Sequence, residues 1–220
     1  MIESIVFDFD GVLVESLDIK TKAFGQLFES EGSEVARQIV QYHVQNMGKS
    51  RLDKFKHIYA HILKRPLGES EFEDLCRRFS SLVLEKVVEA PSVSGALEFL
   101  RAYSDSFQCF VASATPHSEI EEIVKKRGMS GFFCGVFGAP TTKKEIVRLL
   151  IDGKKISTPT SVFVGDALAD YSAATENGLY FIARLNHTNE RIFDQIECPK
   201  IKDLKNLHNE INHLPTAKTI

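Results

Sequence analysis

The sequence predicts an α/β fold: a parallel sheet covered by helices on both faces, with an all-helical insert directly after the first strand. Three observations support this. The chain opens with a short apolar run that ends in two aspartates and a glycine within residues 4–11. Helical periodicity then fills residues 17–90, and from residue 91 short apolar runs alternate with helical segments. Strands that alternate with helices pair in parallel, and such sheets are covered on both faces.

The first strand is expected at residues 4–7, which are mostly β-branched or aromatic, as in short buried strands. Asp8 and Asp10 follow it, and Gly11 closes the run. Carboxylates there are unfavourable unless they are solvated, paired or metal-bound, and ligands bind at the carboxyl ends of strands in open α/β sheets. The motif therefore places Asp8 and Asp10 for chemistry, although an Asp-x-Asp-Gly sequence can also be only a turn.

The insert that follows is expected to be entirely helical. Apolar residues recur at three- and four-residue spacing in four successive stretches up to residue 90. Ser70 with Glu73 predicts a capping box that opens the fourth helix, and Pro91 ends the block. We therefore expect one domain at residues 16–91, inserted into a catalytic core made of residues 1–15 and 92–220.

The remainder of the chain alternates between the two kinds of element. Thr115 is expected as an N-cap with Pro116 at the first helical position, and Thr142 with Glu145 as a capping box. The sequence after about residue 187 is weakly patterned, and residues 215–220 are expected to be loosely held. Helices are expected over 96–103, 115–128, 142–151 and 167–177, and strands over 107–112, 134–137, 161–164 and 179–183.

A second acidic motif follows the strand at 161–164. Asp166 comes directly after that strand, and Asp170 lies one helical turn further on, so both can face one site. Asp166 could instead be only an N-cap. Together with Asp8 and Asp10, these side chains form a hard oxygen site suited to Mg²⁺ rather than to zinc.

Two weaker signals lie at the starts of helices. Ser113 precedes the helix expected from 115, where a hydroxyl and free backbone N–H groups can bind an anion, although helix capping explains it equally well. Lys143 and Lys144 lie in the first turn of the next helix. Either could neutralise a phosphate, but solvated surface charge is the commoner role of lysine.

Composition excludes several classes of function. A net charge of −3 argues against a broad basic face for nucleic acid. No apolar run approaches the ~20 residues of a membrane span, and the N-terminus has no signal-peptide pattern. The cysteines are widely spaced and form no Cys-x-x-Cys pair, which is typical of free thiols in a reducing compartment. We therefore expect a cytoplasmic protein without nucleic-acid or membrane partners; its cysteines are Cys76, Cys109, Cys134 and Cys198.

Taken together and in order, these motifs resemble those of the haloacid dehalogenase superfamily of phosphohydrolases. The resemblance implies a three-layer, Rossmann-like core and a mobile helical cap formed by the insert. It also implies a phosphate-ester substrate, because dehalogenases and phosphonatases of this type generally lack the aspartate found here at position 10. The residues that carry it are Asp8-Phe9-Asp10-Gly11-Val12, Ser113, a lysine near 143 and Gly165-Asp166-Ala167-Leu168-Ala169-Asp170.

The resemblance assigns a role to each residue of these motifs. Asp8 would attack phosphorus and form an aspartyl-phosphate, and Asp10 would protonate the leaving alcohol and then deprotonate water. Mg²⁺ would be held by Asp8, the backbone carbonyl of Asp10, and Asp166. Ser113 and Lys143 would hold the phosphoryl oxygens. Gly11 and Ala114 would lie against the substrate, Asp170 would support the metal site, and Lys144 is the alternative to Lys143.

Within the insert, the sequence Gly48-Lys49-Ser50-Arg51 resembles the substrate loop of β-phosphoglucomutase-like members, in which the arginine contacts a second phosphate. The alternative is a helix start with Ser50 as N-cap. Those mutases usually have a histidine where this chain has Lys20, and a lysine where it has Met47. This favours a phosphatase, while Lys20, Lys49 and Arg51 favour a substrate with a second anionic group.

The function expected from the sequence is a Mg²⁺-dependent phosphatase acting on a small phosphomonoester, such as phosphoglycolate or a sugar phosphate. The alternatives are a phosphomutase of the same fold and a non-catalytic member of it. A phosphoacceptor receiver domain is disfavoured, because its connections are short whereas this insert has about 75 residues. The expected partner is a small phosphorylated molecule, and the expected state is a monomer or homodimer.

Overall fold

The computed structural model describes residues 1–215 and contains a parallel sheet in the order β3-β2-β1-β4-β5-β6. The fold class expected from the sequence is confirmed, because every pairing in this sheet is parallel and helices flank it. β1 lies at the centre, so the chain segment that follows it is surrounded by the ends of β2 and β4. The strands are β1 (Ser4–Phe7), β2 (Gln108–Pro116), β3 (Gly135–Ala139), β4 (Ser161–Gly165), β5 (Tyr180–Arg184) and β6 (Lys200–Ile201).

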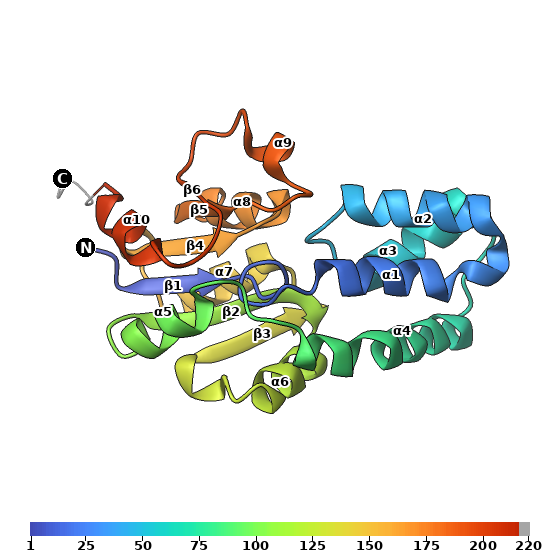
Figure 1. Cartoon of the computed structure of the whole chain (residues 1–220), viewed down its shortest axis with the longest axis horizontal. Helices are drawn as coiled ribbons and strands as arrows, with labels where there is room; N and C mark the ends of the chain where they lie inside the picture. The colour runs from blue at the N-terminus through green and yellow to red at the C-terminus, as the bar shows by residue number, and fades with distance from the viewer. Residues whose placement is uncertain (216–220) are drawn as a thin grey trace.

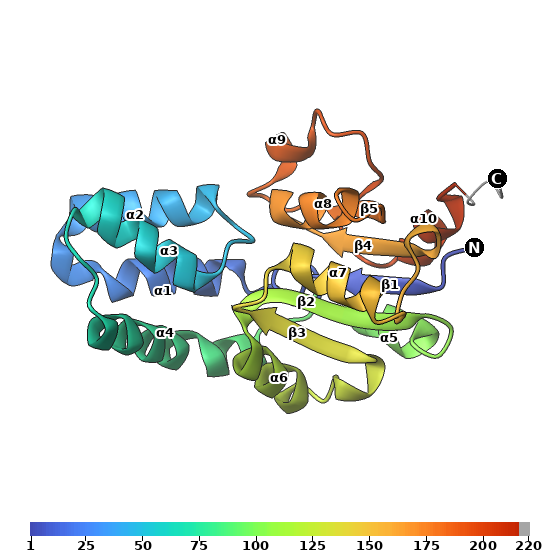
Figure 2. The same ribbon diagram turned by 180° about the vertical axis from the view of Figure 1, so that it is seen from behind.

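Helices cover both faces of the sheet, as the alternation of strand side chains requires (Figures 1 and 2). Phe7 of β1 packs with Phe99 of α5 on one face, whereas Val6 packs with Ile146 of α7 on the other. The core helices are α5 (Ala96–Tyr103), α6 (His117–Lys126), α7 (Lys143–Asp152), α8 (Leu168–Thr175), α9 (Glu190–Phe193) and α10 (Leu207–His213), with short 3-10 turns at Ser130–Phe132 and Thr158–Thr160.

The helical insert stands beyond the carboxyl ends of the strands, which point toward it (Figure 1). Its interior is aromatic: Phe24, Phe28, Phe55 and Phe79 are almost completely buried and pack at tilted or edge-on angles. These rings belong to the same hydrophobic cluster as Phe7 and other residues on one face of the sheet. Its helices are α1 (Leu17–Leu27), a 3-10 turn (Glu29–Glu31), α2 (Ser33–Gln45), α3 (Arg51–His57) continued by a π-helical segment (Ile58–Leu63), and α4 (Glu69–Glu89).

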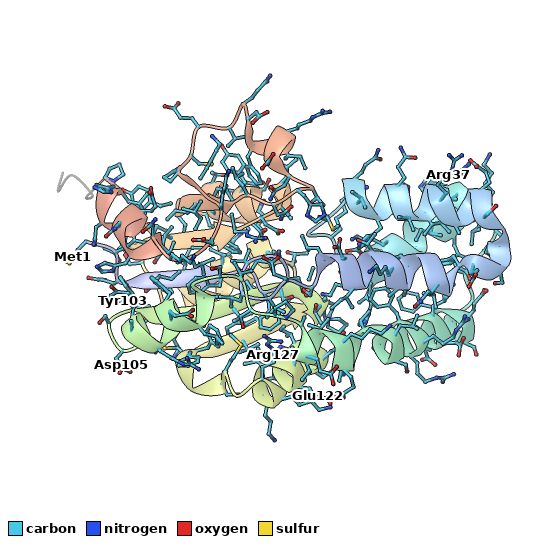
Figure 3. All side chains as sticks on the ribbon, in the orientation of Figure 1. Met1, Arg37, Tyr103, Asp105, Glu122 and Arg127 are labelled. Carbon is cyan, nitrogen blue, oxygen red and sulfur yellow. The ribbon has the colours of Figure 1, made fainter. Side chains whose placement is uncertain are left out.

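Two chain segments connect the insert to the core, and they lie side by side. The backbone N–H of Glu15 donates to the carbonyl of Pro91, at 3.0 Å. Arg127, labelled in Figure 3, donates to the carbonyls of Val87, Val88 and Ala90 at the end of α4, at 2.6–2.8 Å. These bonds satisfy carbonyls that a helix end leaves without partners, and they fix the point at which α4 leaves the core.

The capping predictions had different outcomes. The capping box of Thr142 with Glu145 is confirmed at the start of α7. The box of Ser70 with Glu73 is wrong, because α4 begins at Glu69 and Gly68 occupies the N-cap. Thr115 is not an N-cap either: β2 continues through residue 116, and the hydroxyl of Thr115 is bonded in the cavity described below.

The last part of the chain is more ordered than its pattern indicated. Residues after 187 form α9, the two-residue strand β6 and α10, and Leu204, Leu207 and Ile211 pack into the core. A strand of two residues is too short to show a period, so periodicity could not reveal it. Of the residues expected to be loosely held, 216–220 lie outside the described part of the chain. No helix within residues 1–215 is long and apolar enough to cross a bilayer.

Candidate active site

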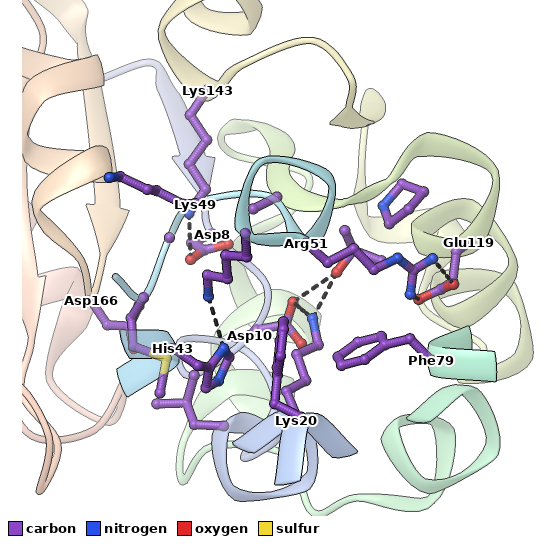
Figure 4. Close-up of a pocket in the computed structure, with 18 residues that line it drawn as sticks. Asp8, Asp10, Lys20, His43, Lys49, Arg51, Phe79, Glu119, Lys143 and Asp166 are labelled. Atoms are coloured by element: carbon purple, nitrogen blue, oxygen red, sulfur yellow. Dashed lines mark hydrogen bonds and ion pairs between the residues drawn. The ribbon is translucent and has the colours of Figure 1, made fainter. Parts of the chain in front are cut away.

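Asp8 lies at the centre of a buried group of charges at the carboxyl edge of the sheet (Figure 4). Carboxylate oxygens of Asp8, Asp166 and Asp170 lie within 4.8 Å of one another. Lys143 bridges two of them: its Nζ is 2.6 Å from Oδ2 of Asp8 and 2.6 Å from Oδ1 of Asp170. The first and fourth sequence motifs and the start of α7 are therefore brought together at one point.

Asp170 fixes the positions of Lys143 and of the turn that contains Asp166. Its Oδ2 accepts hydrogen bonds from the backbone N–H groups of Asp166 and Ala167, at 3.2 and 3.0 Å, while its Oδ1 receives Lys143. Because all of these partners are protein groups, Asp170 positions Lys143 and the turn after β4. Asp8 and Asp166, unlike Asp170, line the cavity described below.

Glycine is required where the two acidic loops meet. Gly11 has φ +77°, and a Cβ at this position would lie 2.3 Å from Oδ2 of Asp166. A side chain would therefore push the two loops apart in addition to straining the backbone. The close approach explains why the Asp-x-Asp sequence ends in glycine.

Burial and the closeness of these charged groups shift the pKa values of Asp8, Asp166 and Lys143. Burial raises the pKa of Asp8 to about 7, despite the attraction of Lys143. Burial, together with the charges of Asp8 and Asp170, raises the pKa of Asp166 well above its ordinary value. Burial alone would lower the pKa of Lys143, but Asp170 and Asp8 hold it above its usual range. The group carries more negative charge than its lysine neutralises.

This donor set fits a divalent cation. Three carboxylates and one ammonium leave two negative charges uncompensated in a buried volume, where burial first and the neighbouring carboxylates second raise the pKa values of Asp8 and Asp166. Carboxylate oxygens are the ligands that Mg²⁺ prefers. Asp8 and Asp166 are the residues able to hold it, and a bound cation would return both acids to their charged forms.

Asp10 faces a different set of partners from Asp8. Its Oδ1 accepts from the Ser16 hydroxyl at 2.6 Å, and its Oδ2 accepts from Lys20, with which it forms an ion pair, and from the Thr115 hydroxyl at 3.1 Å. Burial acts to raise the pKa of Asp10, but Lys20, Ser16 and Thr115 hold it below its usual range. The pKa values of the two motif aspartates are therefore shifted in opposite directions, because Asp8 is buried among carboxylates and Asp10 among hydrogen-bond donors.

The other core residues expected at the site lie around this centre. Ser113 is fully buried, and its Oγ accepts from the backbone N–H of Thr115 at 3.1 Å. It lines a small hollow together with Ala114 and Lys143. Lys144 is exposed and pairs with Glu176, so of the two lysines only Lys143 reaches Asp8.

Lys20, Lys49 and Arg51, the insert residues expected to bind substrate, all line the cavity described below. Arg51 is buried, and its guanidinium donates to both oxygens of Glu119, at 2.6 and 3.2 Å, and to Ser80 at 2.9 Å. Its charge is therefore neutralised by a carboxylate of the core helix α6. Lys49 is exposed, and Ser50 is the N-cap of α3, accepting from the backbone N–H of Asp53.

A cavity of about 60 Å³ lies between the insert and the core (Figure 4). Asp8, Asp10 and Lys143 line it from the core, while Lys20 and Lys54 line it from the insert. On the insert side the loop at Gly48 lies directly against the β4–α8 turn, since a Cβ there would be 2.8 Å from that of Ala167.

Several residues of the site had no individual signal in the sequence. Asn186 donates to Oδ2 of Asp166 at 2.8 Å, and Asn189 donates to the backbone carbonyl of Asp166 at 2.7 Å. Both lie at the edge of the weakly patterned C-terminal region. Asn186 closely follows an expected strand, at its carboxyl end, and this position is the one feature that could have identified it. Glu119, His43 and Lys54 lie within helices, where they are indistinguishable from ordinary polar residues.

Comparisons with known proteins identify the family of the chain and its fold. A family model described as haloacid dehalogenase-like hydrolase matches residues 5–184. Comparison with curated proteins finds no match. Among solved structures, a predicted phosphoglycolate phosphatase from Haemophilus somnus 129PT is 18% identical with a TM-score of 0.75, covering 94% of this chain and 97% of that one.

Two further solved structures are similar over nearly their whole length. A predicted phosphatase from Clostridium acetobutylicum is 16% identical with a TM-score of 0.77, covering 97% of this chain and 100% of that one. A β-phosphoglucomutase from Clostridium difficile is 18% identical with a TM-score of 0.77, covering 96% and 98%. At these identities the likeness establishes a shared fold.

Proposed function

The chain belongs to the haloacid dehalogenase-like hydrolases, and from this premise we propose that it is a Mg²⁺-dependent phosphatase of a small phosphomonoester. The observation that carries the proposal is the opposite environment of the two motif aspartates. Asp8 lies among carboxylates beside Lys143, whereas Asp10 lies in a network of donors that faces the cavity. One is placed to attack and the other to exchange protons.

In the first half of the proposed reaction, an oxygen of Asp8 attacks phosphorus, and the bond from phosphorus to the ester oxygen breaks. Asp10 must take up a proton when the substrate binds, because its pKa lies below the usual range here, and it gives that proton to the departing alkoxide while Lys143 holds the phosphoryl oxygens. In the second half, Asp10 takes a proton from water, whose oxygen attacks phosphorus and releases phosphate and free Asp8. Mg²⁺ held by Asp8 and Asp166 would supply the positive charge that offsets repulsion between carboxylate and phosphate.

The division into core and cap is part of this proposal. Residues 16–91 would close over the substrate and exclude water, then open to release the products. Two contacts between insert and core support closure at the cavity: Arg51 with Glu119, and Lys20 with Thr115 at 2.7 Å. Both would separate when the cap opens.

The phosphomutase alternative depends mainly on the loop at residues 48–51. In a mutase the arginine would contact a second phosphate, but Arg51 is already neutralised by Glu119. Phosphate release from a panel of phosphomonoesters, with and without a bisphosphate primer, tests the proposal. Release of phosphate supports the phosphatase, isomerisation without release supports the mutase, and silence in both assays supports a non-catalytic role.

The proposed metal site makes a prediction about stability. Because Mg²⁺ would bind the folded state only, a concentration 100 times its dissociation constant should stabilise the protein by about 2.7 kcal/mol. Asp166→Asn removes one of the two expected side-chain ligands, the third ligand being the backbone carbonyl of Asp10, and should abolish most of this gain. Thermal unfolding with Mg²⁺ or EDTA measures both. Equal stabilisation of the wild type and the variant would place the cation elsewhere.

A further inference from the structure

Lys54 is a buried cation whose partner is not a carboxylate. Its side chain is almost fully buried at the wall of the cavity, and its Nζ is 2.9 Å from Nδ1 of His43 and 5.5 Å from the centre of the Phe24 ring. Within residues 1–215, no acidic group lies within ion-pair distance of it. A buried charge without an opposite charge is strongly unfavourable, so its retention calls for an explanation.

The other cations at the cavity are already matched. Lys20 pairs with Asp10, Arg51 with Glu119, and Lys143 with Asp8 and Asp170, while Lys49 is exposed to solvent. Lys54 is therefore the buried positive charge that this cavity leaves unbalanced among the residues lining it. An anion from outside the protein would balance it.

His43 supplies a second donor next to Lys54. Burial lowers the pKa of His43 to about 2, so the imidazole is neutral, and the ammonium of Lys54 donates to Nδ1. The ring proton must then be on Nε2, which is buried and has no hydrogen-bond partner within the described residues. His43 also lines the cavity, so its side chain and the ammonium of Lys54 lie next to each other at this wall, although Nε2 itself is buried.

We propose that Lys54, held by His43, binds a carboxylate of the substrate, so that the substrate is a small phosphorylated carboxylic acid. This inference rests on the proposed phosphatase function and deepens it. One unbalanced cation matches the single charge of a carboxylate better than the two charges of a second phosphate. The cavity of about 60 Å³ favours a short molecule.

The proton affinity of Lys54 is consistent with an unmatched charge. Burial, together with the positive charges of Lys20 and Lys143, lowers the pKa of Lys54 to about 7. Replacing Lys54 by methionine keeps the length of the side chain and removes the buried charge, so the melting temperature should rise rather than fall. A lysine that destabilises the fold is typical of a residue retained for function.

The test compares three esters with the wild type, Lys54→Met and Lys56→Met. Lys56 lies on the same helix but is exposed, so it is the matched control. The esters are phosphoglycolate, ethyl phosphate and ethylene glycol bisphosphate, which carry a carboxylate, no second charge and a second phosphate, respectively. The readout is kcat/KM for phosphate release, together with the melting temperature.

The wild type and Lys56→Met should prefer phosphoglycolate over ethyl phosphate by at least about 30-fold, as expected for one desolvated charge pair. Lys54→Met should lose this preference, because its kcat/KM should fall far more on phosphoglycolate than on ethyl phosphate. Three results would overturn the inference: no preference in the wild type, an equal loss on both esters in Lys54→Met, or a preference for the bisphosphate.

If the proposed phosphatase function is wrong, the assays give a result that differs from failure of the Lys54 inference. If none of the three esters, nor any other in a wider panel, releases phosphate, the phosphatase is wrong. Calorimetric titration of phosphoglycolate into the wild type and Lys54→Met then decides the anion site alone. Binding that depends on Lys54 would support the site, and equal or absent binding would overturn it.

Discussion

Replacing Asp8 by asparagine is expected to lower phosphate release by at least about 10³-fold while leaving the protein folded. The amide has the shape of the carboxylate but cannot act as the nucleophile, and loss of a nucleophile removes the covalent route entirely. Phosphate release in the presence of Mg²⁺ measures the effect. Retention of more than a tenth of the activity would show that Asp8 is not the attacking group.

The same variant has a signature in its stability that is independent of catalysis. Burial raises the pKa of Asp8 from 3.8 to about 7, so the folded state holds its proton more tightly than the unfolded state. The stability contributed by Asp8 is therefore full below pH ~4 and is lost as the pH rises through 7. The amide introduced by Asp8→Asn does not titrate, so in EDTA the variant should gain stability relative to the wild type between pH 4 and 8. Denaturant unfolding at both ends of this range measures the difference, and an opposite trend would contradict the burial of Asp8.

Lys143→Met is expected to cause the largest loss of stability at the site, about 3–5 kcal/mol. Its removal leaves Asp8 and Asp170 buried without the cation that bridges them at 2.6 Å. Lys144→Met is the matched control, because Lys144 is the next residue but is exposed and pairs only with Glu176. Its effect should lie within about 0.5 kcal/mol.

A rescue experiment protects this prediction if Lys143→Met does not fold. Adding Asp170→Asn removes one of the two stranded charges, so the double variant should regain part of the lost stability. Phosphate release should remain low in both, because the lysine that would hold the phosphoryl group is absent. A larger effect from Lys144→Met than from Lys143→Met would contradict the geometry of the site.

Much of the site could be predicted because its residues follow strands. An aspartate directly after a buried strand must emerge at the carboxyl edge of the sheet, which brought Asp8 and Asp166 together in the prediction. The capping box of Thr142 fixed the start of α7, and the structure turns Lys143 inward and Lys144 outward from that start. The sequence alone left these two lysines open, since the direction of a first-turn side chain depends on the packing of its helix.

Contacts between the insert and the core could not be predicted in the same way. Arg51 comes from α3 and Glu119 from α6, and their pairing depends on how the helical insert packs against the helices that cover the sheet. Lys54 and His43 lie on different helices and meet only because α2 and α3 pack together. Thr115 was interpreted as an N-cap because the extension of β2 through the next residue has no local signal.

The most direct test of the central claim is to trap a phosphoryl group on Asp8. In Asp10→Asn, p-nitrophenyl phosphate can still react, since its leaving group departs without a proton, but water is no longer activated for the second step. The variant would be mixed with this ester and Mg²⁺, quenched in acid and digested for mass spectrometry. We predict one added phosphoryl group on the peptide that contains Asp8, absent when Asp8 is also replaced by asparagine. Release of p-nitrophenol with no phosphoryl group on that peptide at any time would contradict the claim that Asp8 is the nucleophile.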